Sequence, residues 1–323
     1  MDHVPQVVQQ ILQGEVRAAA RLMRDLDDGV PVAREVLKKL YPHSGRAHII
    51  GITGSPGVGK STLTDRLIQY LRQEDRTVGV VAVDPTSPFS GGAILGDRIR
   101  MQRHALDEGV FIRSLATRGH FGGLTASSRA VITVLDAMGK DYILVETVGV
   151  GQDEVEIAAT AYTTVVVTVP GLGDDIQAIK AGILEVADIL VVNKADREGA
   201  SRTYQDLLQM LELQSIRKTK SWKPKVFLTQ AKEDRGIQEL LAGVREHQEY
   251  LKKNEGEALV AARYQRVRQE FLELLKEGVF RELVAQLSLN GRMEEILQEI
   301  LEKRTDPYSA SEDLIAETLG GKK

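Results

Sequence analysis

The sequence predicts an α/β protein whose mostly parallel sheet has helices on both faces, with helical extensions at its N-terminal and C-terminal ends. The first supporting observation is a set of short runs rich in Val and Ile, which are nearly continuous in hydrophobicity. Such runs are typical of strands that are covered on both faces. They lie at residues 49–52, 78–83, 110–112, 142–145, 165–169, 189–192 and 226–228. The second observation is that amphipathic stretches separate these runs, which predicts βαβ crossovers.

Three regions are expected along the chain. They are an N-terminal helical extension at residues 1–45, an α/β domain at residues 46–250 and a C-terminal helical arm at residues 251–323. In the last region apolar residues repeat at three- and four-residue spacing, for example from Tyr264 to Leu275. Such broad apolar faces are difficult to bury on a sheet that is already covered, so we expect the arm to form a dimer interface. Packing within the chain is the alternative.

Composition excludes several classes of site. The chain has 323 residues, 42 Lys and Arg against 46 Asp and Glu, a net charge of −4 and no cysteine. Disulfides, cysteine-based metal sites and cysteine nucleophiles are therefore excluded. The slightly acidic balance gives no reason to expect binding to nucleic acid. No signal peptide is recognisable in Met1–Arg17, and no apolar stretch approaches the roughly 20 residues that cross a bilayer. We expect a cytoplasmic protein that does not insert into membranes.

The first motif with chemical content follows the strand at residues 49–52. It matches the pattern G-x-x-x-x-G-K-[ST] and leads into an amphipathic helix. Glycines let successive backbone N–H groups turn toward phosphates, and the helix N-terminus adds a positive dipole end. Lys60 is expected to reach the β- and γ-phosphates, and the Ser61 hydroxyl to bind Mg²⁺. The predicted phosphate-binding residues are Gly54, Ser55, Pro56, Gly57, Val58, Gly59, Lys60, Ser61 and Thr62.

A second motif predicts recognition of guanine. Asn193, Lys194 and Asp196 form an N-K-x-D pattern directly after the strand at residues 189–192. The Asp196 carboxylate can accept hydrogen bonds from the N1–H and N2–H₂ groups of guanine, which adenine lacks. The Lys194 stem can lie on the base, and the Asn193 amide can support the base and brace the phosphate loop.

A further loop is expected at the same base. It follows the last predicted strand and is placed to offer backbone N–H groups to the guanine O6 atom. Its residues are Thr229, Gln230 and Ala231. The ligands expected overall are therefore GTP or GDP together with Mg²⁺.

Carboxylates at strand ends predict the metal site. Asp84 ends one strand, Glu146 ends another, and Asp97 lies in a loop after a glycine. Mg²⁺ prefers octahedral oxygen ligands and keeps several waters. We expect Ser61 and Asp97 as direct ligands, with Asp84 and Glu146 acting through water. Lys60, Asp84, Asp97 and Glu146 are the predicted catalytic residues. Helix capping by the carboxylates is the alternative interpretation.

One position predicts slow chemistry. Glu146 opens a variant of the D-x-x-G motif, and Val150 follows its glycine where Ras-like GTPases have a water-positioning Gln. Gln152 lies two residues further on. We therefore expect slow intrinsic hydrolysis that a partner or a second subunit accelerates.

Taken together, the motifs resemble the MeaB/ArgK family of P-loop GTPases. The resemblance rests on residues 54–62, 83–87, 117–123, 146–152 and 193–196, and it covers about residues 40–235 closely. It implies a homodimeric GTPase that escorts an adenosylcobalamin-dependent acyl-CoA mutase. The GTPase would gate cofactor delivery by an adenosyltransferase and protect or reactivate the mutase.

The resemblance also implies mobile switch segments near residues 84–97, 146–158 and 170–180. The switch residues that it indicates are Gly149, Gln152, Asp153, Asp174, Asp175 and Lys180. At Asp153 the family usually has a small hydroxyl residue, so the extra charge makes the behaviour of this switch an open question. For Asp174, a helix N-cap is the simpler alternative.

Three other functions stay open at this stage. A nickel-insertion GTPase needs soft or imidazole ligands, and the scattered histidines argue against it. A kinase would transfer the γ-phosphate of GTP to an acceptor, for which the sequence shows no second site. A scaffold that binds GTP without turnover is compatible with Val150 but not with the set of carboxylates.

Overall fold

The computed structural model describes residues 3–84, 101–116, 126–147, 157, 160–171, 186–215, 222–253 and 257–320. The chain divides into two compact units, Met1–Leu259 and Val260–Lys323. The first unit holds the sheet and the N-terminal helices, and the second holds helices alone.

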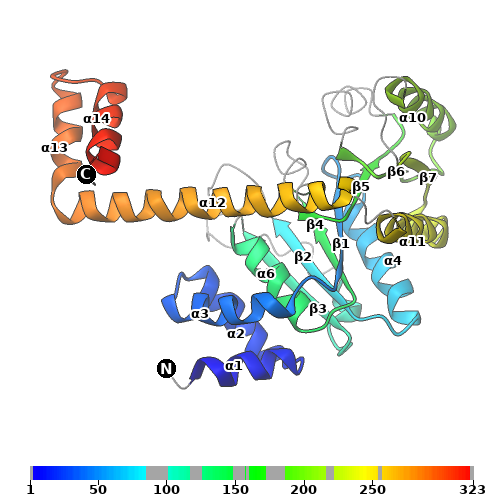
Figure 1. Cartoon of the computed structure of the whole chain (residues 1–323). Helices are drawn as coiled ribbons and strands as arrows, with labels where there is room; N and C mark the ends of the chain where they lie inside the picture. The colour runs from blue at the N-terminus through cyan, green and yellow to red at the C-terminus, as the bar shows by residue number, and fades with distance from the viewer. Residues whose placement is uncertain are drawn as a thin grey trace. The chain divides into compact units, whose positions relative to one another are not determined.

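The first unit is built on one sheet of seven strands in the order β3-β2-β4-β1-β5-β6-β7 (Figure 1). All pairings between neighbouring strands are parallel. Each of the seven apolar runs forms a strand, so the predicted fold class is confirmed. The strands are β1 (His48–Thr53), β2 (Val78–Asp84), β3 (Val110–Ala116), β4 (Tyr142–Glu146), β5 (Thr163–Thr168), β6 (Ile189–Val192) and β7 (Lys225–Leu228).

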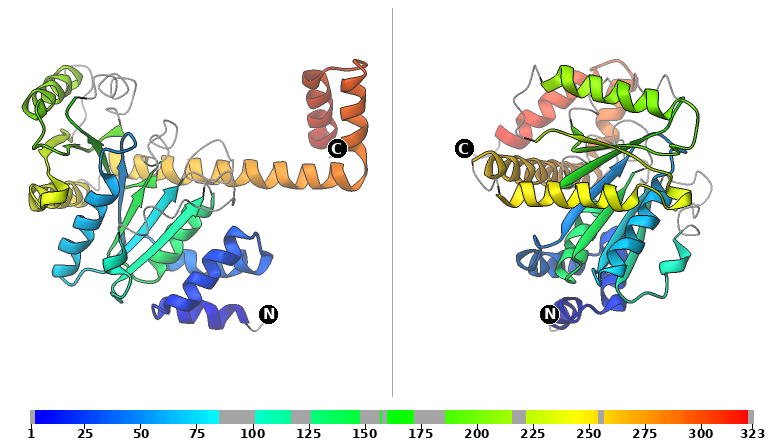
Figure 2. Two further views of the ribbon diagram at one scale, coloured as in Figure 1. Left: turned by 180° about the vertical axis from the view of Figure 1, so that it is seen from behind. Right: turned by 90° about the vertical axis from the view of Figure 1, so that its right-hand side faces the viewer.

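Helices cover both faces of this sheet (Figure 2). Alternate residues of a strand point to opposite faces, and β5 shows the two layers. Val165 and Val167 pack in the cluster that contains buried residues of α4 (Lys60–Gln73) and α11 (Ile237–Lys253). Val166 packs instead with Leu207 of α10 (Ala200–Ser215). A third cluster joins α6 (Ala126–Ala137) to the sheet.

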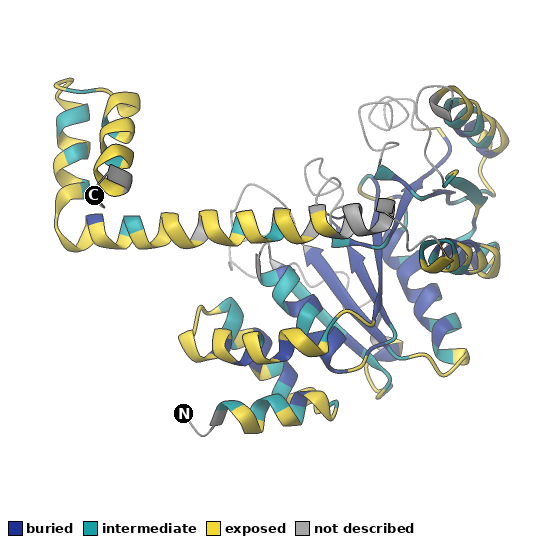
Figure 3. Cartoon of the chain, in the orientation of Figure 1, coloured by how far each residue is buried: buried dark blue, intermediate teal, exposed yellow. Residues whose placement is uncertain are grey.

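Three N-terminal helices extend the layer of α6. They are α1 (His3–Leu12), α2 (Val16–Asp27) and α3 (Pro31–Leu40). Ile11, Met23 and Leu40 are fully buried in the same cluster as the apolar side chains of α6. In Figure 3 the central strands β1, β4, β5 and β6 are buried, whereas the outer faces of these helices are exposed. Apolar burial therefore joins the N-terminal helices to the sheet in one unit.

The edge strand β3 runs further than its apolar sequence predicts. The prediction ended at Ile112, but the strand continues to Ala116. Arg113 and Ser114 interrupt the apolar run, because an edge strand has a neighbour on one side only and tolerates polar residues. The Arg113 guanidinium pairs with Asp27 of α2 instead.

The second unit contains most of α12 (Glu257–Leu289), followed by α13 (Arg292–Leu301) and α14 (Pro307–Gly320). Gly291, with φ of 69°, makes the left-handed turn that ends α12 and begins α13. The Asp306 carboxylate accepts the N–H groups of Tyr308 and Ser309 and so caps α14. No helix in the described part of the chain is long and apolar enough to cross a membrane.

A buried carboxylate fixes the chain where it enters the sheet. Asp136 of α6 accepts the backbone N–H groups of Gly45, Arg46 and Ala47 at 2.6, 3.0 and 3.0 Å. Asp136 is 5% exposed. These hydrogen bonds hold the segment between α3 and β1, which sets the start of the strand that leads to the phosphate loop.

We predict that Asp136→Ala lowers the free energy of unfolding by about 2–4 kcal/mol, because three N–H groups lose a charged acceptor. Urea titration followed by circular dichroism measures the change. The control is Glu35→Ala, which removes an exposed ion pair with Lys38 and should cost less than about 1 kcal/mol. Equal losses for the two variants would contradict the anchoring role.

Candidate nucleotide site

The predicted site residues follow strands that end at the same edge of the sheet. Because all seven strands are parallel, their carboxyl ends meet there. β1 lies at the centre, with β4 and β2 on one side and β5, β6 and β7 on the other. The phosphate motif follows β1, Glu146 ends β4, and Asn193 follows β6. The predicted phosphate and metal residues thus lie toward β2, and the predicted guanine residues toward β7.

The loop after β1 requires glycine at two positions. Gly54 has φ of 136°, and a Cβ atom there would lie 2.0 Å from the carbonyl oxygen of Val167. Gly59 has φ of 99°, and a Cβ atom there would lie 2.5 Å from the Asn193 Nδ2 atom. Such positive φ values strain other residues. At these two positions the loop therefore passes so close to β5 and Asn193 that no side chain fits.

Lys60 and Ser61 begin α4 directly after this loop. Lys60 Nζ donates hydrogen bonds to the carbonyl oxygens of Gly54 and Ser55 at 2.7 and 3.2 Å. Both Lys60 and Ser61 are less than a tenth exposed. The ammonium group is thus held over the loop whose backbone is expected to bind phosphate, at the positive end of the α4 dipole.

Glu146 connects the end of β4 to α4. Its carboxylate accepts the Ser61 hydroxyl on Oε1 at 2.7 Å and the Thr64 hydroxyl on Oε2 at 3.0 Å. Glu146 is 3% exposed, and Thr64 is fully buried. The Thr64 hydroxyl also lies 3.0 Å from the carbonyl oxygen of Lys60, so its single proton serves one acceptor at a time.

These oxygen atoms suit a hard divalent cation. The Ser61 hydroxyl and the Glu146 carboxylate are in contact at the N-terminus of α4. Mg²⁺ is typically held by one or two protein oxygens together with waters and substrate phosphates, not by a full protein cage. The described residues contain no group of three or more His, Asp or Glu side chains that could hold a metal ion. Asp84 ends β2, and Asp97 lies outside the described residues.

Asn193 joins the two predicted halves of the site. Its Nδ2 donates to the carbonyl oxygen of Val58 in the phosphate loop at 2.8 Å. Its Oδ1 accepts the Thr229 hydroxyl and the Ala231 N–H, both at 3.1 Å. Asn193 is 2% exposed. One buried amide therefore contacts both the phosphate loop and the loop after β7.

Other residues of the N-K-x-D motif and of the loop after β7 lie at the same side of the site. Lys194, with a positive φ of 55°, donates from Nζ to the carbonyl oxygen of Gly57 at 2.7 Å. Asp196 is exposed beside it. Gln230 pairs with Arg235 in a short antiparallel bridge, which closes the loop after β7. All predicted guanine residues are thus brought to one end of the site.

The predicted switch residues cannot be placed in this way. Gly149, Gln152, Asp153, Asp174, Asp175 and Lys180 lie outside the described residues, as does Val150. Thr62 is partly exposed in the first turn of α4.

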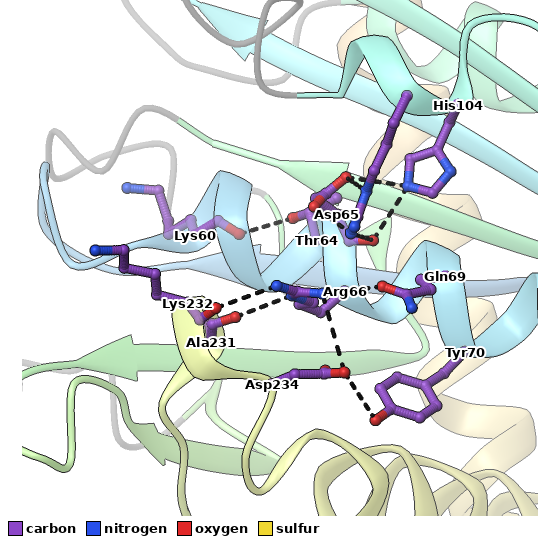
Figure 4. Close-up of polar contacts among 11 residues, drawn as sticks. Lys60, Thr64, Asp65, Arg66, Gln69, Tyr70, His104, Ala231, Lys232 and Asp234 are labelled. Carbon is purple, nitrogen blue, oxygen red and sulfur yellow. Dashed lines mark hydrogen bonds and ion pairs between the residues drawn. The ribbon is translucent and has the colours of Figure 1, made fainter.

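The structure adds a polar cluster on α4 that the sequence analysis did not identify (Figure 4). Arg103 Nε donates to Asp65 Oδ1 at 2.7 Å, and His104 Nε2 lies 3.0 Å from the same oxygen. Burial alone raises the pKa of the Asp65 carboxyl, but hydrogen bonds from His104 and Arg103 outweigh burial, and the pKa is lowered. The segment that begins at Met101 is thereby fastened to α4. Thr64 lies four residues after Lys60, one helical turn further along α4, so the sequence could have indicated it as a residue near the site. No local signal in the sequence marks the partners of Asp65.

A parallel sheet with this glycine loop, Lys60 and Ser61 at the start of α4, and the N-K-x-D sequence after β6 defines the class of P-loop GTPases. Residues 20–288 match the model of the methylmalonyl-CoA mutase-associated GTPase MeaB family. The chain belongs to this family, and it is a GTP hydrolase that binds guanine nucleotides.

Relatives of known name agree with this assignment. A Pyrococcus abyssi protein, whose name assigns it provisionally to the GTPases, is 49% identical over 98% of each chain. GTPase ArgK of Escherichia coli is 37% identical over 72% of each chain. The mouse protein named methylmalonic aciduria type A homolog, mitochondrial, is 33% identical over 82% of this chain and 64% of its own.

The similarity extends to a solved structure. A crystal structure described as an LAO/AO transport system kinase superposes with a TM-score of 0.72 at 25% sequence identity, covering 98% of this chain and 97% of its own. The fold as a whole is therefore shared with that protein.

We predict that Thr64→Val lowers GTP turnover about tenfold, because Glu146 loses a hydrogen bond worth about 1.5 kcal/mol while the volume at residue 64 is kept. Steady-state phosphate release measures this. Thr133→Val is the matched control, since the Thr133 hydroxyl also bonds the carbonyl four residues earlier, but on α6. Turnover that is equal in the two variants would show that Thr64 contributes nothing through Glu146.

Proposed function

We propose that this GTPase is the chaperone of an adenosylcobalamin-dependent acyl-CoA mutase, which gates cofactor loading from an adenosyltransferase and protects or reactivates the mutase. The observation that carries the proposal is the match of residues 20–288 to a family described as mutase-associated GTPases. The name of the mouse relative, which refers to methylmalonic aciduria, supports the same class of client.

In the proposed site, GTP lies along the carboxyl edge of the sheet. The backbone N–H groups of residues 54–62 and the Lys60 ammonium bind the phosphates. Asp196 reads the N1 and N2 groups of guanine. The loop that carries residues 229–231 offers an N–H group to O6. Because the N–H groups of Thr229, Gln230 and Ala231 already donate within the protein, the proposed donor is the N–H of Lys232. The support for this placement is Asn193, whose contacts to Val58, Thr229 and Ala231 connect the two loops.

The proposed metal is Mg²⁺, held on the protein side by Ser61 and Asp97, with Glu146 and Asp84 acting through water. When bound, it would neutralise charge on the phosphate oxygens. Glu146 and Ser61 fit this role because their oxygens are buried and in contact with each other. The contribution of Glu146 is to orient the Ser61 hydroxyl from the end of β4.

The proposed turnover is slow until a partner is bound. Val150 occupies the place where Ras-like GTPases have the water-positioning Gln, and its aliphatic side chain cannot hydrogen-bond a water. A group from the mutase or from a second subunit would then complete the site. Such dependence would couple GTP hydrolysis to the state of the client.

We expect GTP hydrolysis to rise about tenfold or more when a cobalamin-dependent acyl-CoA mutase from the same source is added, a barrier change of about 1.4 kcal/mol. Phosphate release is measured with γ-labelled GTP, with and without Mg²⁺, and complex formation by gel filtration with GTP and GDP. Lys60→Ala is the control that should not respond. Absence of both stimulation and complex with such mutases would refute the client.

The same assay tests a second candidate, phosphoryl transfer to an acceptor, which the description of the structural relative as a kinase favours. Label that appears in inorganic phosphate alone supports hydrolysis, and label on an added acceptor supports the kinase.

We further propose that the second unit forms a homodimer interface. Large apolar side chains of α12 are exposed at four-residue spacing on one face, namely Val267 at 48%, Phe271 at 61%, Leu275 at 49% and Val279 at 51%. Exposed apolar area of this extent on one helix favours association. A second copy would bury these residues by packing α12 against its equivalent.

Light scattering at micromolar concentration should give the mass of a dimer for the unaltered chain and of a monomer for Phe271→Glu, because a carboxylate cannot be buried in an apolar interface without a partner. Lys276→Glu, an exposed change on the same helix, should remain dimeric. A monomeric unaltered chain would contradict the proposal.

A further inference from the structure

We infer that Arg66 is a positioning residue for guanine, which holds the loop after β7 against the phosphate-binding helix. This inference rests on the role proposed above for the loop after β7. Arg66 lies on α4, six residues after Lys60. Figure 4 shows its guanidinium directed from α4 onto Ala231 and Lys232.

The contact has the geometry of a fork. Arg66 Nε donates to the carbonyl oxygen of Ala231 at 3.1 Å, and Nη2 donates to that of Lys232, also at 3.1 Å. These two nitrogens lie on one side of the planar guanidinium, so both carbonyls are held at once. Two adjacent donors that bind consecutive carbonyls fix both the orientation of the loop after β7 and its distance from α4.

Holding these carbonyls also directs the N–H groups of the loop. The described peptide bonds are all trans, and in a trans peptide the C=O and N–H groups point in opposite directions. The Lys232 N–H therefore points away from Arg66. The N–H groups of Thr229, Gln230 and Ala231 already donate to the carbonyl oxygens of Val192 and Arg235 and to Asn193 Oδ1, at 3.0, 3.0 and 3.1 Å. The Lys232 N–H is therefore the group of this loop that would be offered to guanine O6. The loop is thus held from α4 on one side and from Asn193 on the other.

Further contacts hold the guanidinium in place. Arg66 Nη1 donates to Gln69 Oε1 at 3.1 Å and lies 3.9 Å from Asp234 Oδ2. The Tyr70 hydroxyl donates to the same Asp234 oxygen at 3.2 Å. Asp234 has a positive φ of 56°, which is unusual outside glycine. This conformation turns the chain so that Arg235 pairs with Gln230. With its side chain 21% exposed, Arg66 is shielded from much of the solvent that would weaken these bonds.

The consequence is a rigid link between the two ends of the nucleotide. α4 begins at the residues proposed to bind phosphate, and the same helix carries Arg66 to the loop proposed to bind O6. Without Arg66 the loop would retain the bond to Asn193, but its second support on α4 would be lost. GTP and GDP share the guanine base, so both should be affected equally, while catalysis of bound GTP should not.

The test measures affinities by calorimetry for three nucleotides. GDP is compared with 6-thio-GDP, in which a weaker sulfur acceptor replaces O6, and with IDP, which keeps O6 but lacks the 2-amino group. Arg66→Ala should weaken GDP and IDP binding about tenfold, and 6-thio-GDP binding clearly less, because groups that act through the same contact are not additive. KM for GTP should rise with kcat unchanged.

Two further variants control for the stability of α4. Arg72→Ala removes a guanidinium of the same helix that binds Asp107 and the Arg76 carbonyl, remote from the loop after β7 in sequence and contacts, and should change no affinity. Arg66→Lys keeps the charge but not the fork, so it should show the same pattern with a smaller loss. If Arg66→Ala does not fold, Arg66→Lys carries the comparison.

The outcomes distinguish a failure of the role of Arg66 from a failure of the proposed O6 contact. Equal losses on all three nucleotides, or no loss for GDP, would overturn the role of Arg66. If the unaltered chain binds 6-thio-GDP as tightly as GDP, the proposed O6 contact of the loop after β7 is itself wrong, and the inference fails with it.

Discussion

Glu146, buried at the end of β4, accepts hydrogen bonds from two hydroxyls of α4, and this contact joins the helix to the sheet where the phosphate loop lies between them. A buried carboxylate is costly unless donors surround it. Ser61 and Thr64 supply two of them, from the first two turns of α4. The distance between the helix N-terminus and the strand end is thereby set, and with it the position of Lys60. The other contacts of the site involve the same helix or the phosphate loop that precedes it.

The base side of the site is held by the same helix and by one amide. Asn193 is buried and uses both of its polar atoms, one on the phosphate loop and one on the loop after β7. Arg66 reaches that second loop from α4. Asp65, the preceding residue, fastens the segment around Arg103 and His104 to another side of the helix. Because a helix is stiff, α4 can keep its attachments to Glu146, to the loop after β7 and to the segment around Arg103 in a constant relation to one another.

The fold by itself does not specify the activity of this GTPase. The shared fold extends to a protein described as a kinase, whereas the family model describes a mutase-associated GTPase. A fold admits several activities, so the distinction rests on which groups complete the γ-phosphate end of the site. The second unit, with its exposed apolar side chains, supplies a surface of a different kind. The nucleotide edge and the apolar helix thus suit separate tasks, hydrolysis and association.

Features with a local signal could be predicted from the amino-acid sequence. Nearly continuous apolar runs predicted all seven strands, and fixed spacings located the phosphate motif and N-K-x-D. The predicted end of β3 at Ile112 was too early, since Arg113 breaks the apolar run on this edge strand. The contact of Asn193 with the phosphate loop was expected from the N-K-x-D motif, and the structure confirms it. The strand order and the partners of Thr64 and Arg66, which lie 82 and 165 residues from the groups that they bind, emerged from the tertiary structure. Contacts between residues so far apart in the chain produce no recognisable spacing pattern in the sequence, because they form when parallel strands bring distant loops to one edge of the sheet.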